Sequence, residues 1–174
     1  MPRYTRTAML LHWLIAILIV GAFTLGLIMT SIHGFSPAKL RYYSWHKWAG
    51  VTVLGLAALR LLWRLFNAPP DYPASMSRFQ QGAAHYLHLA LYLLMFAVPI
   101  SGYFYTLAAG VPVVYFGMFQ MPVLIDADPH LKPILQGVHY WLTMTMAALV
   151  TAHTAAALKH AIIDRDGVLR RMLP

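Results

Sequence analysis

The sequence predicts an all-α integral membrane protein, a four-helix bundle that forms one transmembrane domain over residues 1–174. Hydrophobic residues make up 60% of the chain and charged residues only 10%, whereas soluble domains carry about 25% charged residues. Four apolar runs, at about residues 8–30, 43–66, 82–108 and 134–163, each reach the roughly 20 residues that cross a bilayer. Lipid is therefore expected to surround the folded chain.

Local features limit the predicted helices in turn. The first, 8–30, lacks a small-residue cleavage site after its apolar stretch, so we expect a retained helix and no removed signal peptide. The second ends before Pro69 and Pro70, because proline cannot continue a helix. The third contains Pro99 and is expected to kink there. The connection 109–133 before the fourth is long for a bundle, and long connections are often functional.

The basic residues predict the orientation, because Lys and Arg accumulate on the cytoplasmic side of a membrane protein. One predicted side carries nine of them and the other carries four. The first side holds Arg3, Arg6, Arg60, Arg64, Arg78, Lys159, Arg165, Arg170 and Arg171, and the second holds Lys39, Arg41, Lys47 and Lys132. Both termini belong to the nine-residue side and are therefore expected in the cytoplasm, with the connection 109–133 outside.

Composition also limits the chemistry and the partners. The chain has no cysteine, which excludes disulfides, iron–sulfur clusters, thiolate zinc sites and covalent haem attachment. Its formal net charge is +8, and most of the basic residues flank the apolar runs. Membrane lipid with anionic headgroups, and not nucleic acid, is therefore the expected partner of this charge.

Histidines within the predicted helices carry the functional signal, because ionisable residues at membrane depth are costly. His139 and His153 are 14 residues apart on the fourth helix. That is nearly four whole turns, so the two side chains share a face and lie about 21 Å apart along the axis. One lies near the outer surface and the other in the inner half. The spacing predicts two cofactors stacked across one bilayer.

Each of these histidines has a candidate partner at matching depth. His46, near the outer end of the second helix, lies opposite His139 with no competitor at that level. The candidates for His153 are His12, His85 and His88. Depth alone favours His88, and the residues by themselves leave the choice open.

Two histidines at each level favour haem. Two imidazoles from facing helices saturate haem iron and make an electron-transfer centre, whereas zinc sites need three or four protein ligands. The carboxylates, Asp71, Asp126, Asp128, Asp164 and Asp166, all fall outside the apolar runs, so metal-dependent hydrolysis and a carboxylate proton pump are not expected. 

Two arginines are candidate contacts for haem propionates. Arg60 follows His46 by 14 residues on the same helix face, and Arg64 follows one turn later. A buried arginine needs an anion, which a propionate supplies. Extension of the side chain to lipid headgroups is an equal alternative for Arg60 and the favoured one for Arg64.

An ordered set of motifs across nearly the whole chain resembles the bacterial cytochrome b561 family. These motifs are Leu11-His12-Trp13-Leu14, Trp45-His46-Lys47-Trp48-Ala49-Gly50, Arg60-Leu61-Leu62-Trp63-Arg64, His85-Tyr86-Leu87-His88, Val98-Pro99-Ile100-Ser101-Gly102-Tyr103, Val114-Tyr115-Phe116-Gly117, His153-Thr154-Ala155-Ala156-Ala157-Leu158-Lys159-His160 and the tail from Asp164 to Pro174. No single motif is decisive, but their order is specific.

The resemblance implies a di-haem b-type cytochrome of the bacterial inner membrane, with ubiquinone as redox partner. It implies that His12 pairs with His153 at the inner haem and His46 with His139 at the outer haem. His88 then becomes a residue beside the haem or at the quinone site. The family often has Lys-His-His at the end of the fourth helix, whereas this chain has Lys159, His160 and Ala161.

Two activities are compatible with the resemblance. One type of family member is a superoxide oxidase, which takes electrons from superoxide at the outer face and delivers them to ubiquinone near the inner haem. Other relatives serve a dehydrogenase partner as membrane electron-transfer subunits. We favour a superoxide:ubiquinone oxidoreductase because the chain ends soon after the fourth helix. A transporter is disfavoured because neither internal repeats nor a polar path is present.

The resemblance also directs attention to two surfaces. Near the inner haem, His160, Lys159, His88 and Arg78 are the candidate neighbours of the quinone. Near the outer haem, Lys39, Arg41, Lys47 and Lys132 could attract an anionic donor, although ordinary solvated charge is the favoured explanation of these four residues.

Overall fold

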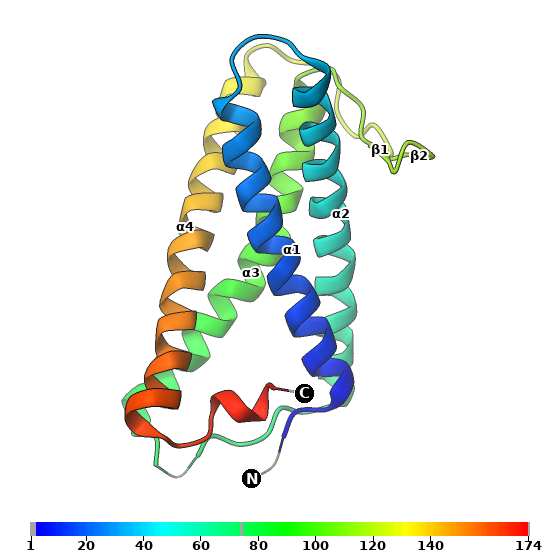
Figure 1. Ribbon diagram of the computed structural model, residues 1–174. Coiled ribbons are helices and arrows are strands. Elements are labelled where there is room, and N and C mark those ends of the chain that lie inside the picture. Colours follow the sequence, from blue (N-terminus) through cyan, green and yellow to red (C-terminus); the bar gives the residue numbers. More distant parts are fainter. Residues whose placement is uncertain (1–2, 74, 174) are drawn as a thin grey trace.

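The computed structural model describes residues 3–73 and 75–173. Four long helices form the bundle (Figure 1): α1 (Arg6–Ser31), α2 (Pro37–Phe66), α3 (Arg78–Ala108) and α4 (Leu131–Lys159). All four are long and apolar enough to cross a membrane. The prediction of a four-helix membrane protein is therefore confirmed.

The helices begin a few residues before their apolar runs because polar residues cap their first turns. The Thr5 hydroxyl caps α1 and the Ser36 hydroxyl caps α2, where Pro37 occupies the first turn. Ser77 and Gln80 form a reciprocal capping box at the start of α3. Consequently α2 starts at residue 37 and not near 43, and α3 at 78 and not near 82.

The helices pack around a narrow apolar core at mid-length. This core consists of Ile15, Val53, Ala57, Leu94, Met95 and Met146. Most other large apolar side chains on the helices are at least partly exposed, and Leu10, Ile17, Leu65 and Leu93 are examples on three of them. Such a surface is suited to lipid, in which an outward-facing leucine is favourable.

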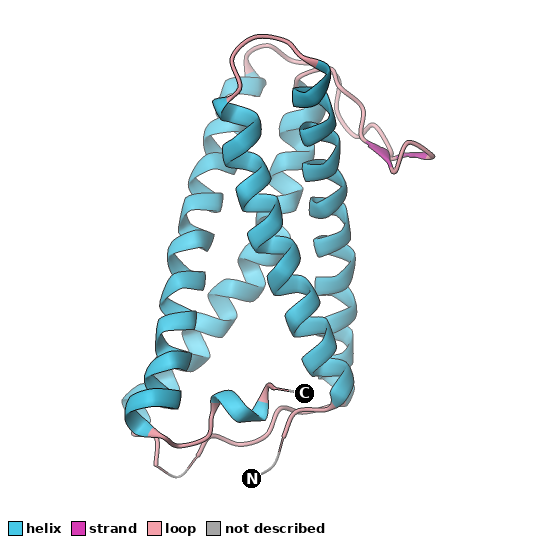
Figure 2. Cartoon of the chain, in the orientation of Figure 1, coloured by secondary structure: helices cyan, strands magenta, loops and turns pink. Residues whose placement is uncertain are grey.

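The chain ends meet at one end of the bundle, which we call the terminal end (Figure 2). After α4 the chain makes a π-helical turn, η1 (His160–Asp164), and a short 3-10 helix, η2 (Leu169–Arg171). This segment returns across the bundle, where the Tyr4 amide donates to the Arg171 carbonyl at 3.2 Å. The Trp13 indole also donates to the Met172 carbonyl at 2.8 Å.

The connection between α3 and α4 lies at the opposite end, which we call the hairpin end (Figure 1). It contains two short antiparallel strands, β1 (Val114–Tyr115) and β2 (Phe119–Gln120). Phe116 and Gly117 have φ values of 50° and 72°, as in the tight turns that match the twist of a hairpin. The sequence predicted a long functional connection but not this hairpin, so the fold is mostly helical and not purely so.

Trp48 and Thr52 fix the hairpin to α2. The Trp48 indole donates to the Val114 carbonyl at 2.8 Å, and the Thr52 and Tyr115 hydroxyls are 2.9 Å apart. The connection therefore folds back along the bundle beside α2.

Candidate cofactor sites between the helices

The hairpin end of the bundle holds one pair of facing histidines. His46 on α2 and His139 on α4 have ring centroids 6.2 Å apart, with ring planes at 88°. Both residues are partly buried. The sequence predicted this pair, and the structure brings the two rings together.

Hydrogen bonds select the nitrogen that each of these rings offers. The Nδ1 atom of His46 lies 2.9 Å from the Ala22 carbonyl oxygen, which can only accept a hydrogen bond. His139 Nδ1 lies 3.1 Å from the Val98 carbonyl and 3.0 Å from the Ser101 hydroxyl, which itself donates to Val98 at 2.8 Å. In both rings Nδ1 must therefore carry the proton. Nε2 is left with the lone pair that can bind a metal.

A cavity of about 720 Å³ includes both histidines in its wall. Its volume lies within the range of about 300–1,000 Å³ that is usual for cofactor sites. Val113 and Met121 from the connection also line it, and the Tyr103 hydroxyl holds this segment by donating to the Pro122 carbonyl. The hairpin connection thus covers a space of cofactor size beside the histidine pair.

Glycines provide room for both rings. A Cβ atom at Gly102 would lie 2.8 Å from Cε1 of His139, closer than real Cβ atoms approach. A Cβ at Gly26 would meet His46 at 3.5 Å, which is ordinary contact. Gly102 is therefore required for the observed position of His139. The sequence analysis quoted Gly102 only within a family motif and did not identify this role.

The terminal half of the bundle holds three neighbouring histidines. His153 on α4 lies 6.2 Å from His12 on α1, with ring planes at 80°, and 5.3 Å from His88 on α3, with ring planes at 67°. His85 is exposed, and its ring packs against Tyr86 at 5.4 Å. The structure thus gathers two of the three candidate partners of His153.

The two 6.2 Å pairs fit an iron atom between the rings. Imidazole nitrogens bind first-row metals at about 2 Å, so two rings on opposite sides of one iron have centroids about 6 Å apart. The His46–His139 and His12–His153 distances match this value. The His88–His153 distance of 5.3 Å is shorter. Geometry therefore favours His12 over His88, which depth along the sequence did not.

The two candidate propionate arginines have different surroundings. Arg60 is partly buried and donates to the Ala8 carbonyl at 2.6 Å and to the Tyr92 hydroxyl at 3.1 Å. Arg64 is exposed, with its guanidinium 5.5 Å from the Tyr92 ring centroid. Among the described residues neither forms an ion pair with a carboxylate. Arg60 is thus held inside the bundle by α1 and α3 and remains able to meet an anion.

The candidate quinone neighbours fall into separate groups. Nδ1 of His160 lies 2.6 Å from Asp166, and the Lys159 ammonium lies 2.6 Å from Asp164. Within the part of the chain that the structure describes, no hydrogen bond or ion pair joins these groups to His88 or to Arg78. The sequence analysis had placed both aspartates outside the membrane and gave them no partner. Their spacing from His160, four and six residues, was the available signal.

Four membrane-length helices with paired histidines inside are the architecture of a membrane-bound b-type cytochrome. Comparison with known proteins agrees, since the model of the family described as prokaryotic cytochrome b561 matches residues 3–174. The chain belongs to this family. Its members are multi-pass bacterial membrane proteins that bind haem b and transfer electrons.

Individual relatives cover nearly all of the chain. "Cytochrome b561 homolog 2" of Escherichia coli K12 is 38% identical over 172 residues, which are 98% of this chain and 91% of that protein. "Probable superoxide oxidase CybB" of Yersinia pestis is 30% identical over 94% of this chain and 92% of its own length. "Cytochrome b561 homolog 1" of E. coli K12 is 25% identical over 100% of this chain and 98% of its own length.

Proposed function

We propose that this protein is a superoxide:ubiquinone oxidoreductase with two haem b groups. His46 and His139 hold the haem at the hairpin end, and His12 and His153 hold the haem in the terminal half. The observation that carries the proposal is the equal 6.2 Å spacing of both histidine pairs at two levels of the same helix. When bound, haem b supplies reversible one-electron transfer between ferric and ferrous iron.

The overall reaction balances as a two-electron transfer. Two superoxide anions each lose one electron and become two molecules of oxygen. Ubiquinone gains these two electrons and takes up two protons to become ubiquinol. The protein must therefore bring an anion to one end of the bundle and protons to the other. Its histidines provide the path between, about 21 Å along α4.

The hairpin end is the proposed entry point for superoxide. Lys47 lies beside His46 in the sequence and lines the 720 Å³ cavity, so its ammonium group can attract an anion to the cavity. Arg41 and Lys132 are exposed at the same end. The Lys39 ammonium instead binds the Ile32 carbonyl at 2.8 Å, which stabilises the end of α1. The name of the relative from Y. pestis supports superoxide as the donor.

The terminal end is the proposed quinone side and faces the cytoplasm of a bacterial inner membrane. The excess of basic residues at this end supports that orientation. His160, Lys159, His88 and Arg78 remain the candidate quinone neighbours. His160 is the strongest of them, because the Asp166 carboxylate at 2.6 Å orients its ring and such a pair can deliver a proton to a reduced quinone.

The first test measures haem content. We expect two haems per purified chain and one in each of the variants His139→Ala and His153→Ala. A wild-type ratio near one, or two haems in either variant, contradicts the paired-histidine assignment.

The second test measures the donor. Superoxide generated in solution should reduce the haems of the purified protein, and the rate should fall as ionic strength rises, because salt screens attraction between an anion and a basic cavity. Lys47→Gln should slow the rate with both haems retained, whereas Arg6→Gln at the other end should not. Rates that do not respond to salt or to Lys47→Gln favour electron delivery by a partner protein such as a dehydrogenase.

The third test concerns the quinone. His160→Ala should slow ubiquinone reduction while the haems are still reduced by superoxide. Unchanged haem content together with an unchanged rate of quinone reduction means that His160 has no part in the quinone site.

A further inference from the structure

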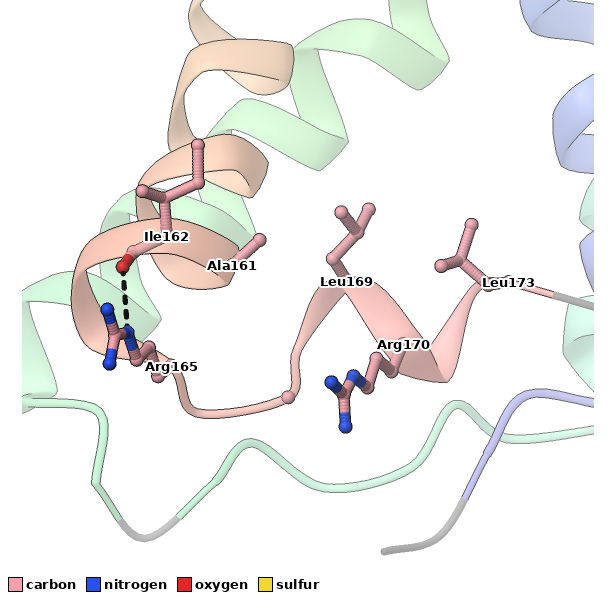
Figure 3. Close-up of a pocket in the computed structure, with 7 residues that line it drawn as sticks. Ala161, Ile162, Arg165, Leu169, Arg170 and Leu173 are labelled. Carbon is pink, nitrogen blue, oxygen red and sulfur yellow. Dashed lines mark hydrogen bonds between the residues drawn. The ribbon is translucent and has the colours of Figure 1, made fainter.

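A second cavity lies at the terminal end, where the chain turns back after α4 (Figure 3). Its volume is about 560 Å³. It is lined by Ala161, Ile162, Arg165, Gly167, Leu169, Arg170 and Leu173. All of these residues come from the last 14 positions of the chain, and none belongs to the histidine pairs. The cavity is therefore a separate feature of the C-terminal segment, and we call it the C-terminal cavity.

The C-terminal cavity has two chemically different sides. Ile162, Leu169 and Leu173 extend toward the helices in Figure 3, whereas Arg165 and Arg170 extend away from them. An amphiphile with an anionic head and apolar chains matches this separation. Its head would meet the guanidinium groups, and its chains would lie toward the membrane interior.

The apolar side continues onto the surface of α4. Ile162 is 65% exposed, and the neighbouring Ile163 and Leu158 are also exposed. These residues lie in the last turns of the membrane-length segment Leu131–Asp164. The cavity therefore opens at the level where lipid headgroups meet the hydrocarbon region.

The basic side of the cavity is not neutralised by the protein. Both nearby carboxylates already have partners, since Asp164 binds Lys159 and Asp166 binds His160, each at 2.6 Å. Among residues 3–73 and 75–173, no carboxylate forms an ion pair with the two guanidinium groups of the cavity. They are thus available to an external anion.

The backbone at Arg165 is an independent sign that this side chain has a role. Its φ and ψ are 51° and 33°, in the left-handed region that favours glycine or asparagine. An arginine at such a position is unfavourable for the backbone, and such exceptions cluster at functional sites. Its Nε donates to the Ile162 carbonyl at 3.2 Å, which orients the guanidinium.

We propose that the C-terminal cavity binds an acidic phospholipid. Arg165 and Arg170 bind the headgroup phosphate by charge-assisted hydrogen bonds. The acyl chains lie along Ile162 and the apolar surface of α4. The bound lipid covers the C-terminal segment where it crosses the terminal end of the bundle.

The test uses the full-length, haem-loaded protein in a nonionic detergent. Phosphatidylglycerol and phosphatidylcholine with identical acyl chains are titrated separately, and bound lipid is counted by native mass spectrometry. We expect tighter binding of phosphatidylglycerol. Arg165→Gly, which suits the left-handed backbone, should weaken it about fivefold, and addition of Arg170→Gln should weaken it by about the same factor again. The matched control, Arg41→Gln with Lys132→Gln, removes two charges from the hairpin end and should bind phosphatidylglycerol normally.

Four outcomes overturn the proposal. The first is equal affinity for the two lipids, and the second is unchanged phosphatidylglycerol binding in the double variant while its haem spectrum is native. The third is displacement of the lipid by glycerol phosphate at equal concentration, which indicates a site for a soluble phosphate. The fourth is displacement by a water-soluble quinone, which assigns the cavity to the quinone.

Discussion

Gly102→Ala is the smallest change that should remove a haem from this protein. Gly102 lies on α3 beside the ring of His139. A Cβ at this position would lie 2.8 Å from Cε1, 3.1 Å from Nδ1 and 3.4 Å from Nε2 of that ring. The added methyl group therefore acts directly on the proposed haem ligand.

The magnitude follows from these distances. Ordinary contact begins at 3.4 Å, so the ring edge must move by at least 3.4 − 2.8 = 0.6 Å. Such a shift is large compared with a nitrogen–metal bond of about 2 Å. It also disturbs the hydrogen bonds of Nδ1 to Ser101 and Val98. Overpacking typically costs about 1–3 kcal/mol, whereas alanine stabilises a helix over glycine by about 0.5–1 kcal/mol. The bundle should therefore stay folded while the haem at the hairpin end is weakened.

The assay is the ratio of haem to protein after purification. We expect a fall from near two to near one for Gly102→Ala. Gly26→Ala, with 3.5 Å to His46, and Gly55→Ala, with nothing within 4 Å, should retain both haems. Two haems with an unchanged spectrum in Gly102→Ala refute the reasoning. Haem loss in Gly55→Ala as well would assign the effect to helix substitution in general.

Three further predictions concern other residues. Ser101→Ala removes one acceptor from Nδ1 of His139, which lowers the basicity of the ligand and should raise the midpoint potential of that haem in spectroelectrochemical titration. His12→Ala should lose one haem and His88→Ala should retain both, as measured by haem content; the reverse result assigns the ligand to His88. Asp128 accepts hydrogen bonds from two backbone amides at the start of α4, and these hold its pKa below the usual value of 3.8. This stabilisation is present above that value and is lost as pH falls below it, so the melting temperatures of wild type and Asp128→Asn should differ at pH 6 and converge near pH 3.

The sequence was sufficient to predict the four helices because lipid imposes a simple requirement on each of them. A span needs about 20 apolar residues, and Pro69 and Pro70 mark where the second cannot continue. The positions of the helix starts were less well predicted, because they depend on capping by Thr5, Ser36 and Ser77. Capping residues lie outside the apolar runs, so hydrophobicity alone does not reveal them.

The histidine pairs were partly predictable. The 14-residue interval between His139 and His153 defines two levels, because helix geometry is regular along one chain. The partner of His153 was not predictable in this way, since it depends on how α1 and α3 rotate about their axes. Small differences in rotation separate the 6.2 Å distance to His12 from the 5.3 Å distance to His88.

Features formed between distant segments could not be predicted from periodicity. The Trp48 indole binds the Val114 carbonyl, 66 residues later. The Trp13 indole binds the Met172 carbonyl, 159 residues later. Both are side-chain contacts to backbone oxygens, and a carbonyl oxygen has no signature in the sequence. The hairpin and the returning C-terminal segment therefore appear only in the structure.

The two histidine pairs also differ in a way that predicts the direction of electron flow. At the hairpin end, both rings direct Nδ1–H to backbone carbonyls, which makes the ligands more basic and stabilises ferric iron. Among the described residues, His12 and His153 have no such hydrogen bond. 

The terminal half instead holds the Arg60 guanidinium on the Ala8 carbonyl, one turn before His12, and a nearby positive charge favours the less positive ferrous state. Both effects should give the haem at the hairpin end the lower midpoint potential, so that electrons entering there move toward the quinone side. The measurement is a redox titration of wild type against His139→Ala, which retains only the haem of the terminal half. If the haem that remains has the lower of the two wild-type potentials, the hydrogen bonds and Arg60 do not set the order. Electron transfer from the hairpin end would then be uphill between the haems and would have to be driven by the donor.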